Sequence, residues 1–231
     1  MVYYLSAHKK SLCARKFLYH FERKITIHSR KSIKILMAEG DLKDKAIISF
    51  FSPQKAKRAE DVRINYSGVC DNIFYIGVPD IDLKYLSDYG YTYETYIEDT
   101  KGLSEFIYNA KSNGLDIICQ CDFGQSRSAA CASAILEHFE GSGIDIFSNY
   151  DYYPNQVVYH KVFDALENHL YDLAVDYIKT TPSHISVDNI QRKLQVGFGK
   201  ANAIINKMLE ERIIERDKNN SSKFMICNEK I

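Results

Sequence analysis

An apolar segment, a glycine-containing loop and an alanine-rich segment follow one another in the middle of the chain and constrain its fold most. Residues 115–120 have the pattern of a buried strand, and residues 128–139 have the composition of a buried helix. Further apolar runs predict strands at residues 32–36, 45–51 and 72–77. Helical spacing occurs at residues 103–110. Strands alternating with helices predict an α/β domain with a central, mostly parallel sheet flanked by helices.

The charge and the spacing of apolar residues change twice along the sequence, which predicts three regions. Residues 1–32 contain eight lysines and arginines against one acidic residue, so they are interpreted as a basic N-terminal extension, which is either solvated or in contact with an anionic partner. Residues 33–170 form the predicted α/β domain. From residue 171 to residue 231, apolar positions recur with helical spacing and end in a polar turn and a short apolar run. A small C-terminal domain is therefore predicted at 171–231.

Charge and cysteine spacing predict a soluble cytoplasmic protein. Thirty basic and thirty acidic residues cancel, so nucleic acid or a membrane would have to be recognised by a local patch. The six cysteines form neither a disulfide framework nor a Cys-x2-Cys zinc pair. No apolar run approaches the roughly 18 residues that a transmembrane helix requires. The N-terminus lacks the hydrophobic core of a secretory signal, and no membrane partner is expected.

The loop between the predicted strand and helix carries a nucleophile and an anion clamp. Cys121 is followed after five residues by Arg127 and then Ser128. Such a loop directs backbone N–H groups toward one point, and the helix dipole adds a positive field that favours an anion and a thiolate. Arg127 can offer two donors to a phosphate, and Ser128 can hydrogen-bond the sulfur. The residues expected around the phosphate are Asp122, Phe123, Gly124, Gln125, Ser126 and Arg127. A plain buried thiol is the alternative interpretation of Cys121.

With these residues the segment resembles the signature loop of the protein tyrosine and dual-specificity phosphatases. The resemblance covers roughly residues 33–170 and includes the segment from Tyr152 to Tyr159, which is similar to one in small bacterial members. It implies a tyrosine-phosphatase-like fold and a two-step reaction without metal or other cofactor. Cys121 attacks phosphorus, an aspartic acid protonates the leaving oxygen, and water hydrolyses the phosphocysteine. Gln120 replaces the family's usual histidine, so a weakly active or inactive phosphate-binding module is the alternative hypothesis.

The general acid that the resemblance implies lies on a loop before the cysteine. Val78-Pro-Asp80 resembles the family's Trp-Pro-Asp loop, with valine in the tryptophan position. Asp80 is the first candidate for the acid, Asp82 the second, and Asp88 a third that rests on spacing alone. A solvated loop carboxylate is the alternative interpretation of each.

Residues 183–227 have the order helix, glycine turn, helix and hairpin, which is typical of a winged helix-turn-helix domain. Ser186 is a suitable N-cap for the first of these helices. The segment resembles the winged-helix gamma domain of FtsK-type DNA translocases, which implies contacts to DNA phosphates by Arg192, Lys193 and Lys200. Winged helices also bind proteins, so a DNA partner and a protein partner are both retained as hypotheses.

Other enzyme classes also use a Cys-x5-Arg loop. Low-molecular-weight phosphatases and arsenate reductases carry it at the extreme N-terminus, unlike this chain. A rhodanese-like phosphatase fits less well with the upstream Asp loop and with Ser128. We therefore predict a phosphatase acting on phosphate monoesters, such as phosphotyrosine or dual-specificity protein substrates, with a C-terminal domain that binds DNA or a partner.

Overall fold

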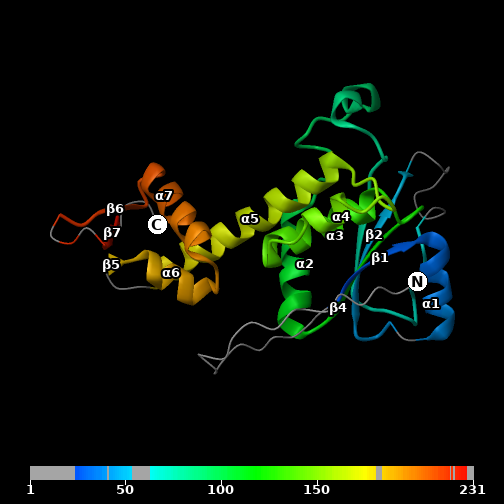
Figure 1. Cartoon of the computed structure of the whole chain (residues 1–231), viewed down its shortest axis with the longest axis horizontal. Helices are drawn as coiled ribbons and strands as arrows, with labels where there is room; N and C mark the ends of the chain where they lie inside the picture. The colour runs from blue at the N-terminus through cyan, green and yellow to red at the C-terminus, as the bar shows by residue number, and fades with distance from the viewer. Residues whose placement is uncertain are drawn as a thin grey trace.

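A computed structural model of the chain describes residues 24–40, 42–53, 63–180, 184–218, 220 and 222–227. Most of the predicted basic extension, residues 1–23, lies outside these ranges. A parallel sheet flanked by helices forms one unit, and a long helix leads from it to a smaller unit of helices and short strands (Figure 1). The predicted α/β fold class with a small C-terminal domain is thus confirmed.

The larger sheet has four parallel strands in the order β1-β4-β2-β3. The strands are β1 (Ile25–Ser29), β2 (Lys45–Phe51), β3 (Ile73–Gly77) and β4 (Asp116–Cys121). The two central strands, β2 and β4, are buried at every position after their first residue, because both faces of the sheet are covered. Cys121 is the last residue of β4, so it lies at the carboxyl edge of the sheet, where α/β proteins bind ligands.

The first strand and helix differ from the prediction. Residues 32–36, predicted as a strand, lie within α1 (Arg30–Glu39), so that prediction was wrong. Ser29 and Ser32 form a reciprocal capping box that starts the helix. The strand that precedes it, β1, lies in the segment predicted as an extension. An alternation of five residues is too short to distinguish a strand from an amphipathic helix. In α1, only Ile33 is fully buried.

Three long helices cover one face of the sheet, and α1 covers the other (Figure 1). The helices of the first face are α2 (Thr100–Asn113), α3 (Arg127–Glu140) and α5 (Gln156–Lys179). The short helix α4 (Ile144–Phe147) connects α3 to the segment before α5, and two 3-10 turns, η3 (Leu83–Tyr85) and η4 (Ser87–Tyr89), follow β3. The predicted strands at β2, β3 and β4 and the predicted helices at α2 and α3 are present.

Helix α5 belongs to two hydrophobic cores. Its first half, including Val158 and Leu166, packs with the sheet, and its second half, from Leu170 to Ile178, packs in the smaller unit. That unit contains α6 (Val187–Leu194), α7 (Phe198–Glu210) and the antiparallel strands β5 (His184–Ile185), β7 (Phe224–Ile226) and β6 (Ile214–Arg216), in that order. The predicted division between residues 170 and 171 falls inside one uninterrupted helix. It lies close to the point where the buried side chains of α5 stop packing in the first core and begin packing in the second.

In the described ranges, no helix combines the length and apolar character needed to cross a bilayer.

Candidate active site

The loop from β4 to α3 surrounds the sulfur of Cys121 with donors. The backbone N–H of Gly124 donates to Cys121 Sγ at 3.2 Å, and Ser128 Oγ lies 3.0 Å from the same sulfur. Gly124 has a φ of 74°, and a Cβ at this position would lie 2.7 Å from the backbone nitrogen of Ser29. The loop can therefore curl against the end of β1 only because this residue is glycine. A thiolate here would receive hydrogen bonds from both neighbours.

Arg127 is almost fully buried, with 1% of its surface exposed. Its Nη1 donates to the carbonyl of Val78 at 2.7 Å and to Ser52 Oγ at 3.0 Å, and its Nη2 donates to Asp122 Oδ2 at 3.4 Å. Its Nε is buried and has no hydrogen-bond partner among the described residues. Because an unsatisfied buried donor costs about 1–3 kcal/mol, an anion held by the loop would relieve a cost that the protein otherwise carries.

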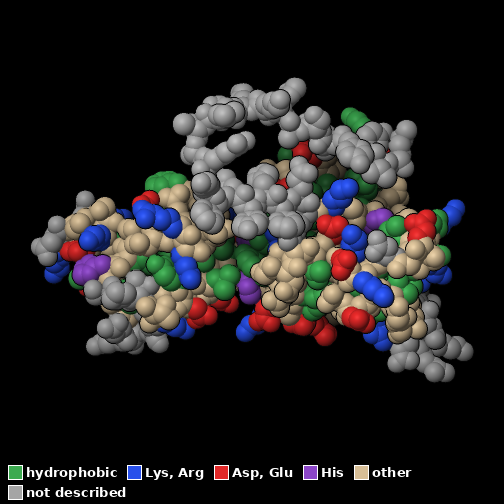
Figure 2. All heavy atoms as spheres, turned by 90° about the horizontal axis from the view of Figure 1, so that it is seen from below, with side chains coloured by type: hydrophobic (Ala, Val, Ile, Leu, Met, Phe, Trp, Pro, Cys, Tyr) green, Lys and Arg blue, Asp and Glu red, His purple; other side chains and the backbone are tan. Residues whose placement is uncertain are grey.

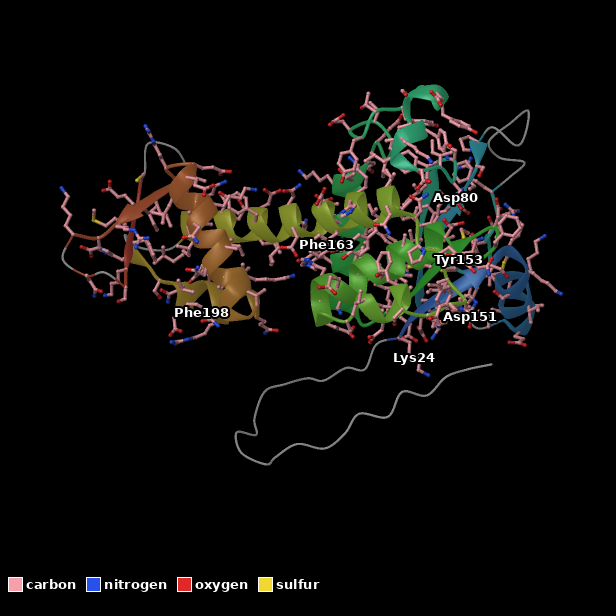
Figure 3. All side chains as sticks on the ribbon, turned by 45° about the horizontal axis from the view of Figure 1, so that its top comes forward. Lys24, Asp80, Asp151, Tyr153, Phe163 and Phe198 are labelled. Atoms are coloured by element: carbon pink, nitrogen blue, oxygen red, sulfur yellow. The ribbon has the colours of Figure 1, made fainter. Side chains whose placement is uncertain are left out.

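Asp80 lies over the loop, at the carboxyl edge of the sheet. Its Oδ1 accepts hydrogen bonds from Ser126 Oγ at 2.7 Å and from Asn155 Nδ2 at 2.9 Å, and its Oδ2 lies 3.7 Å from Arg127 Nε. The hydroxyl of Tyr96 donates to the carbonyl of Pro79, the residue before Asp80, at 2.5 Å. Figure 3 labels Asp80 on the larger unit, above Tyr153 in that view.

The other two candidate acids have different surroundings. Asp82 precedes η3 and makes no side-chain capping bond, and Asp88 lies inside η4. Among the described residues, neither carboxylate is hydrogen-bonded to the loop from Cys121 to Arg127, whereas Asp80 is. The structure therefore brings Asp80, of the three candidates, to the cysteine loop.

The remaining residues of the loop from Cys121 to Arg127 contact neighbouring segments. Asp122 is bound to Arg127 and also to Arg30, whose Nε lies 3.2 Å from Asp122 Oδ1. The backbone carbonyl of Gln125 accepts a hydrogen bond from the N–H of Tyr153 at 2.9 Å. Phe123 and Tyr153 are each 72% exposed. Two exposed aromatic side chains thus lie in or next to the loop from Cys121 to Arg127.

Gln120 fixes the start of the loop from the opposite face of β4. Its Nε2 donates to the carbonyl of Cys121 at 2.6 Å, and its Oε1 accepts from Ser49 Oγ at 2.7 Å and from the hydroxyl of Tyr66 at 3.4 Å. Burial raises the pKa of Tyr66 to about 12, so its hydroxyl stays protonated and can donate. An uncharged amide thus orders the loop where the resembling family uses histidine.

Sequence analysis assigned no site role to Arg30, Ser52, Tyr153 or Asn155, although the last two lie in the segment from Tyr152 to Tyr159 that carries part of the resemblance. Ser52 directly follows β2, so its place at the carboxyl end of a central strand was a usable signal. Asn155 is the N-cap of α5, a position that its sequence context would have suggested. Arg30 belonged to the segment interpreted as an extension, and its proximity to Asp122 follows only from the pairing of β1 with β4.

In the C-terminal unit, two of the three predicted DNA contacts lie at the exposed end of α6. Ser186 caps this helix with a capping box, as predicted. Arg192 forms an exposed ion pair with Asp188, and the ammonium of Lys193 lies 5.5 Å from the centre of the Tyr177 ring. Basic and acidic side chains are interspersed on the face of this unit seen in Figure 2. Exposed pairs of this kind are weak, so both cations can exchange their partners for a phosphate.

Lys200, the third predicted DNA contact, forms hydrogen bonds that connect the two units. From the first turn of α7, its Nζ donates to the carbonyl of His138 and to Glu167 Oε1, both at 2.7 Å. His138 Nδ1 lies 2.7 Å from the same carboxylate, and its Nε2 lies 2.8 Å from the hydroxyl of Tyr108. Burial lowers the pKa of His138, which favours the neutral ring in this cluster. A DNA contact by Lys200 stays a prediction, although in this structure its ammonium joins α7 to α3 and α5.

Comparison with known protein families identifies the C-terminal part of the chain. The model of the FtsK gamma domain matches residues 165–225, which is less than half of the chain. The resemblance predicted for residues 183–227 is thus confirmed, and the match begins earlier, within α5. No curated protein matches the sequence at a significant level.

Several solved structures of phosphatase-like proteins superpose on the chain. The human tyrosine phosphatase-like serine/threonine/tyrosine-interacting protein gives a TM-score of 0.38 at 16% identity, over 62% of this chain and 87% of that one. PTPMT1 gives 0.36 at 10% identity, over 67% and 96%. Its complex with PI(5)P gives 0.36 at 9% identity, over 65% and 94%. At these identities and TM-scores, the likeness supports no conclusion about activity or substrate.

Proposed function

We propose that this protein is a phosphatase that hydrolyses phosphate monoesters, of the phosphotyrosine or dual-specificity protein type, through a phosphocysteine on Cys121. The observation that carries this proposal is the arrangement around Cys121 Sγ. Gly124 N–H and Ser128 Oγ both lie within hydrogen-bond distance of the sulfur, and the buried Nε of Arg127, six residues along the chain, has no hydrogen-bond partner in the part of the chain that the structure describes. A nucleophile and an unsatisfied anion donor on one short loop at a helix N-terminus suit phosphoryl transfer.

The proposed reaction has two steps that share the same groups. The thiolate of Cys121 attacks phosphorus, and Asp80 transfers a proton to the leaving oxygen as the P–O bond breaks. Asp80, now a carboxylate, takes a proton from the water that attacks the phosphocysteine. Ser128 Oγ donates a hydrogen bond to the departing sulfur, so inorganic phosphate and the thiolate are regenerated. Arg127 stabilises the equatorial oxygens in both steps. No step draws on a cofactor, in keeping with the family that the loop resembles.

The test is hydrolysis of para-nitrophenyl phosphate in a chelator, with vanadate as a competitor. We expect wild-type turnover to be inhibited by vanadate and to be lost in Cys121→Ser, because a serine hydroxyl is not ionised at neutral pH and cannot replace the thiolate. Cys227→Ser is the matched control, since Cys227 is a free cysteine in the C-terminal unit. Turnover that survives Cys121→Ser would overturn the proposal. A wild-type protein that binds vanadate without turnover would favour the phosphate-binding module instead.

We further propose DNA binding by the C-terminal unit, which the match to the FtsK gamma domain favours over a protein-docking role. The exposed Arg192 and Lys193 are the residues proposed to contact phosphates. In duplex-binding titrations at several salt concentrations, Arg192→Ala with Lys193→Ala is expected to weaken binding to all sequences. The slope of log K against log salt should fall by about two, roughly one for each phosphate contact.

Lys200→Ala separates the two possible roles of that lysine in the same titration. Because its ammonium is bound to Glu167 and to the carbonyl of His138, we expect this variant to leave the salt slope unchanged. A slope that falls in Lys200→Ala and stays constant in the double variant would contradict this assignment. Absence of duplex binding by the wild type would favour a protein partner.

A further inference from the structure

Asp122, the residue after the candidate nucleophile, places a carboxylate on the loop that is proposed to bind phosphate. Between Cys121 and Ser128, Asp122 is the one carboxylate and Arg127 is the one cation, so the fixed charges of these side chains cancel. A thiolate at Cys121 would make the loop negative. Repulsion between the carboxylate and a phosphate dianion would therefore oppose binding, unless a cation from elsewhere in the chain compensates for Asp122.

Arg30 supplies such a cation from outside the loop. Its Nε lies 3.2 Å from Asp122 Oδ1, and its backbone N–H donates to the carbonyl of Asp122 at 3.1 Å. Arg30 is the first residue of α1 and directly follows β1, whose last residue, Ser29, is paired with Cys121. The side chains of Arg30 and Asp122 are 32% and 15% exposed, so solvent screens their attraction only in part.

The second oxygen of Asp122 contacts the candidate anion clamp. Asp122 Oδ2 accepts from Arg127 Nη2 at 3.4 Å. Nη1 of the same guanidinium donates to the carbonyl of Val78 at 2.7 Å, so both of its terminal nitrogens are held. Asp122 therefore has two opposing effects on the loop: its oxygen helps to orient Arg127, and its charge weakens the attraction for an anion.

We propose that Arg30 is a positioning residue for phosphate binding, which compensates for the charge of Asp122 and lets this carboxylate orient Arg127 without repelling the substrate. This inference rests on the proposed phosphatase function, with phosphate bound by the loop from Cys121 to Arg127. An uncompensated carboxylate would repel the bound substrate and the transition state to a similar degree. The loss of Arg30 should therefore raise KM more than it lowers kcat.

A comparison of four proteins tests this role: the wild type, Arg30→Gln, Asp122→Asn and the double variant. Calorimetric titration with inorganic phosphate measures affinity, and hydrolysis of para-nitrophenyl phosphate gives kcat and KM. We expect Arg30→Gln to weaken phosphate binding about tenfold and to raise KM, because one partly buried carboxylate is left uncompensated. Asp122→Asn removes that carboxylate and leaves the charge of Arg30, so it should bind phosphate more tightly than the wild type.

The double variant separates charge compensation from a merely structural role of Arg30. With both charges removed, phosphate affinity and KM should return to nearly the wild-type values. If Arg30 only holds the start of α1 against the loop, neutralising Asp122 cannot restore the affinity. A folded double variant that binds phosphate as weakly as Arg30→Gln would therefore overturn the proposal.

Lys45→Gln is the matched control. Lys45 Nζ lies 2.8 Å from Asp116 Oδ2, in an ion pair at the opposite end of β4 whose side chains are also partly exposed. This variant loses the same kind of contact far from the carboxyl edge of the sheet and should keep the phosphate affinity of the wild type. Thermal unfolding of every variant shows whether the fold is retained.

Calorimetry requires no turnover, so the two proposals can fail separately. Phosphate affinities in the expected order without hydrolysis by the wild type would overturn the phosphatase function alone. Turnover by the wild type together with unchanged phosphate affinity in Arg30→Gln would overturn the role of Arg30 alone. A wild type that does not bind phosphate would overturn both.

Discussion

Arg127→Lys is expected to lower kcat/KM for para-nitrophenyl phosphate by about 10²–10³-fold, the range found when a preorganised transition-state donor is removed. Lysine keeps the positive charge but not the planar fork of donors. Arg127 uses Nη1 to hold the carbonyl of Val78 and Ser52 Oγ, while its Nε has no hydrogen-bond partner among the described residues and is the donor proposed for the phosphate. A single ammonium cannot satisfy both groups and reach an equatorial oxygen. Steady-state kinetics with both purified proteins measures the effect.

The control for this substitution is Arg216→Lys in the C-terminal unit, where the guanidinium lies 5.7 Å from the centre of the Phe224 ring. It should retain wild-type kinetics. Because Arg127 is buried, its variant also requires a thermal unfolding curve, and vanadate affinity should fall together with kcat/KM. A loss below tenfold in a folded Arg127→Lys protein would show that the guanidinium fork does not bind the transition state.

Asp80→Asn is expected to lower kcat by about 10²–10³-fold with phenyl phosphate, because the leaving phenolate then departs without a proton. Asparagine has the shape of aspartic acid and can still accept from Ser126 and Asn155 at Oδ1, so the loop should keep its position. The loss should be smaller with para-nitrophenyl phosphate.

Asp82→Asn is the discriminating variant for this assignment. Asp82 precedes η3, and only Asp80 of the pair is bonded to the cysteine loop among the described residues. Steady-state rates with phenyl phosphate and para-nitrophenyl phosphate compare the two variants directly. If Asp82→Asn, and not Asp80→Asn, lowers kcat with phenyl phosphate, then Asp82 is the acid and the contacts seen at Asp80 serve the loop alone.

Sequence patterns were informative where the decisive residues are close along the chain. Cys121, Arg127 and Ser128 span one turn between a strand and a helix, so their spacing predicts their approach without knowledge of the rest of the fold. The helix-turn-helix around Gly197 is similarly local, and its resemblance agrees with the family match. The prediction of a strand at residues 32–36 was wrong because it rested on a five-residue alternation and ignored the capping box that Ser29 forms at the start of α1.

Tertiary structure decided the features that depend on distant segments. The choice of Asp80 among three acids requires Ser126 and Asn155, which come from the loop before α3 and the start of α5. The engagement of Lys200 with Glu167 and His138 depends on how α7 packs against α3 and α5. Local spacing determined the proximity of Cys121, Arg127 and Ser128, because a strand and the helix that follows it position their own loop. The position of the Asp80 carboxylate and the contacts of Lys200 arise from side chains that only the folded chain brings within hydrogen-bond distance, and no pattern in the sequence encodes those distances.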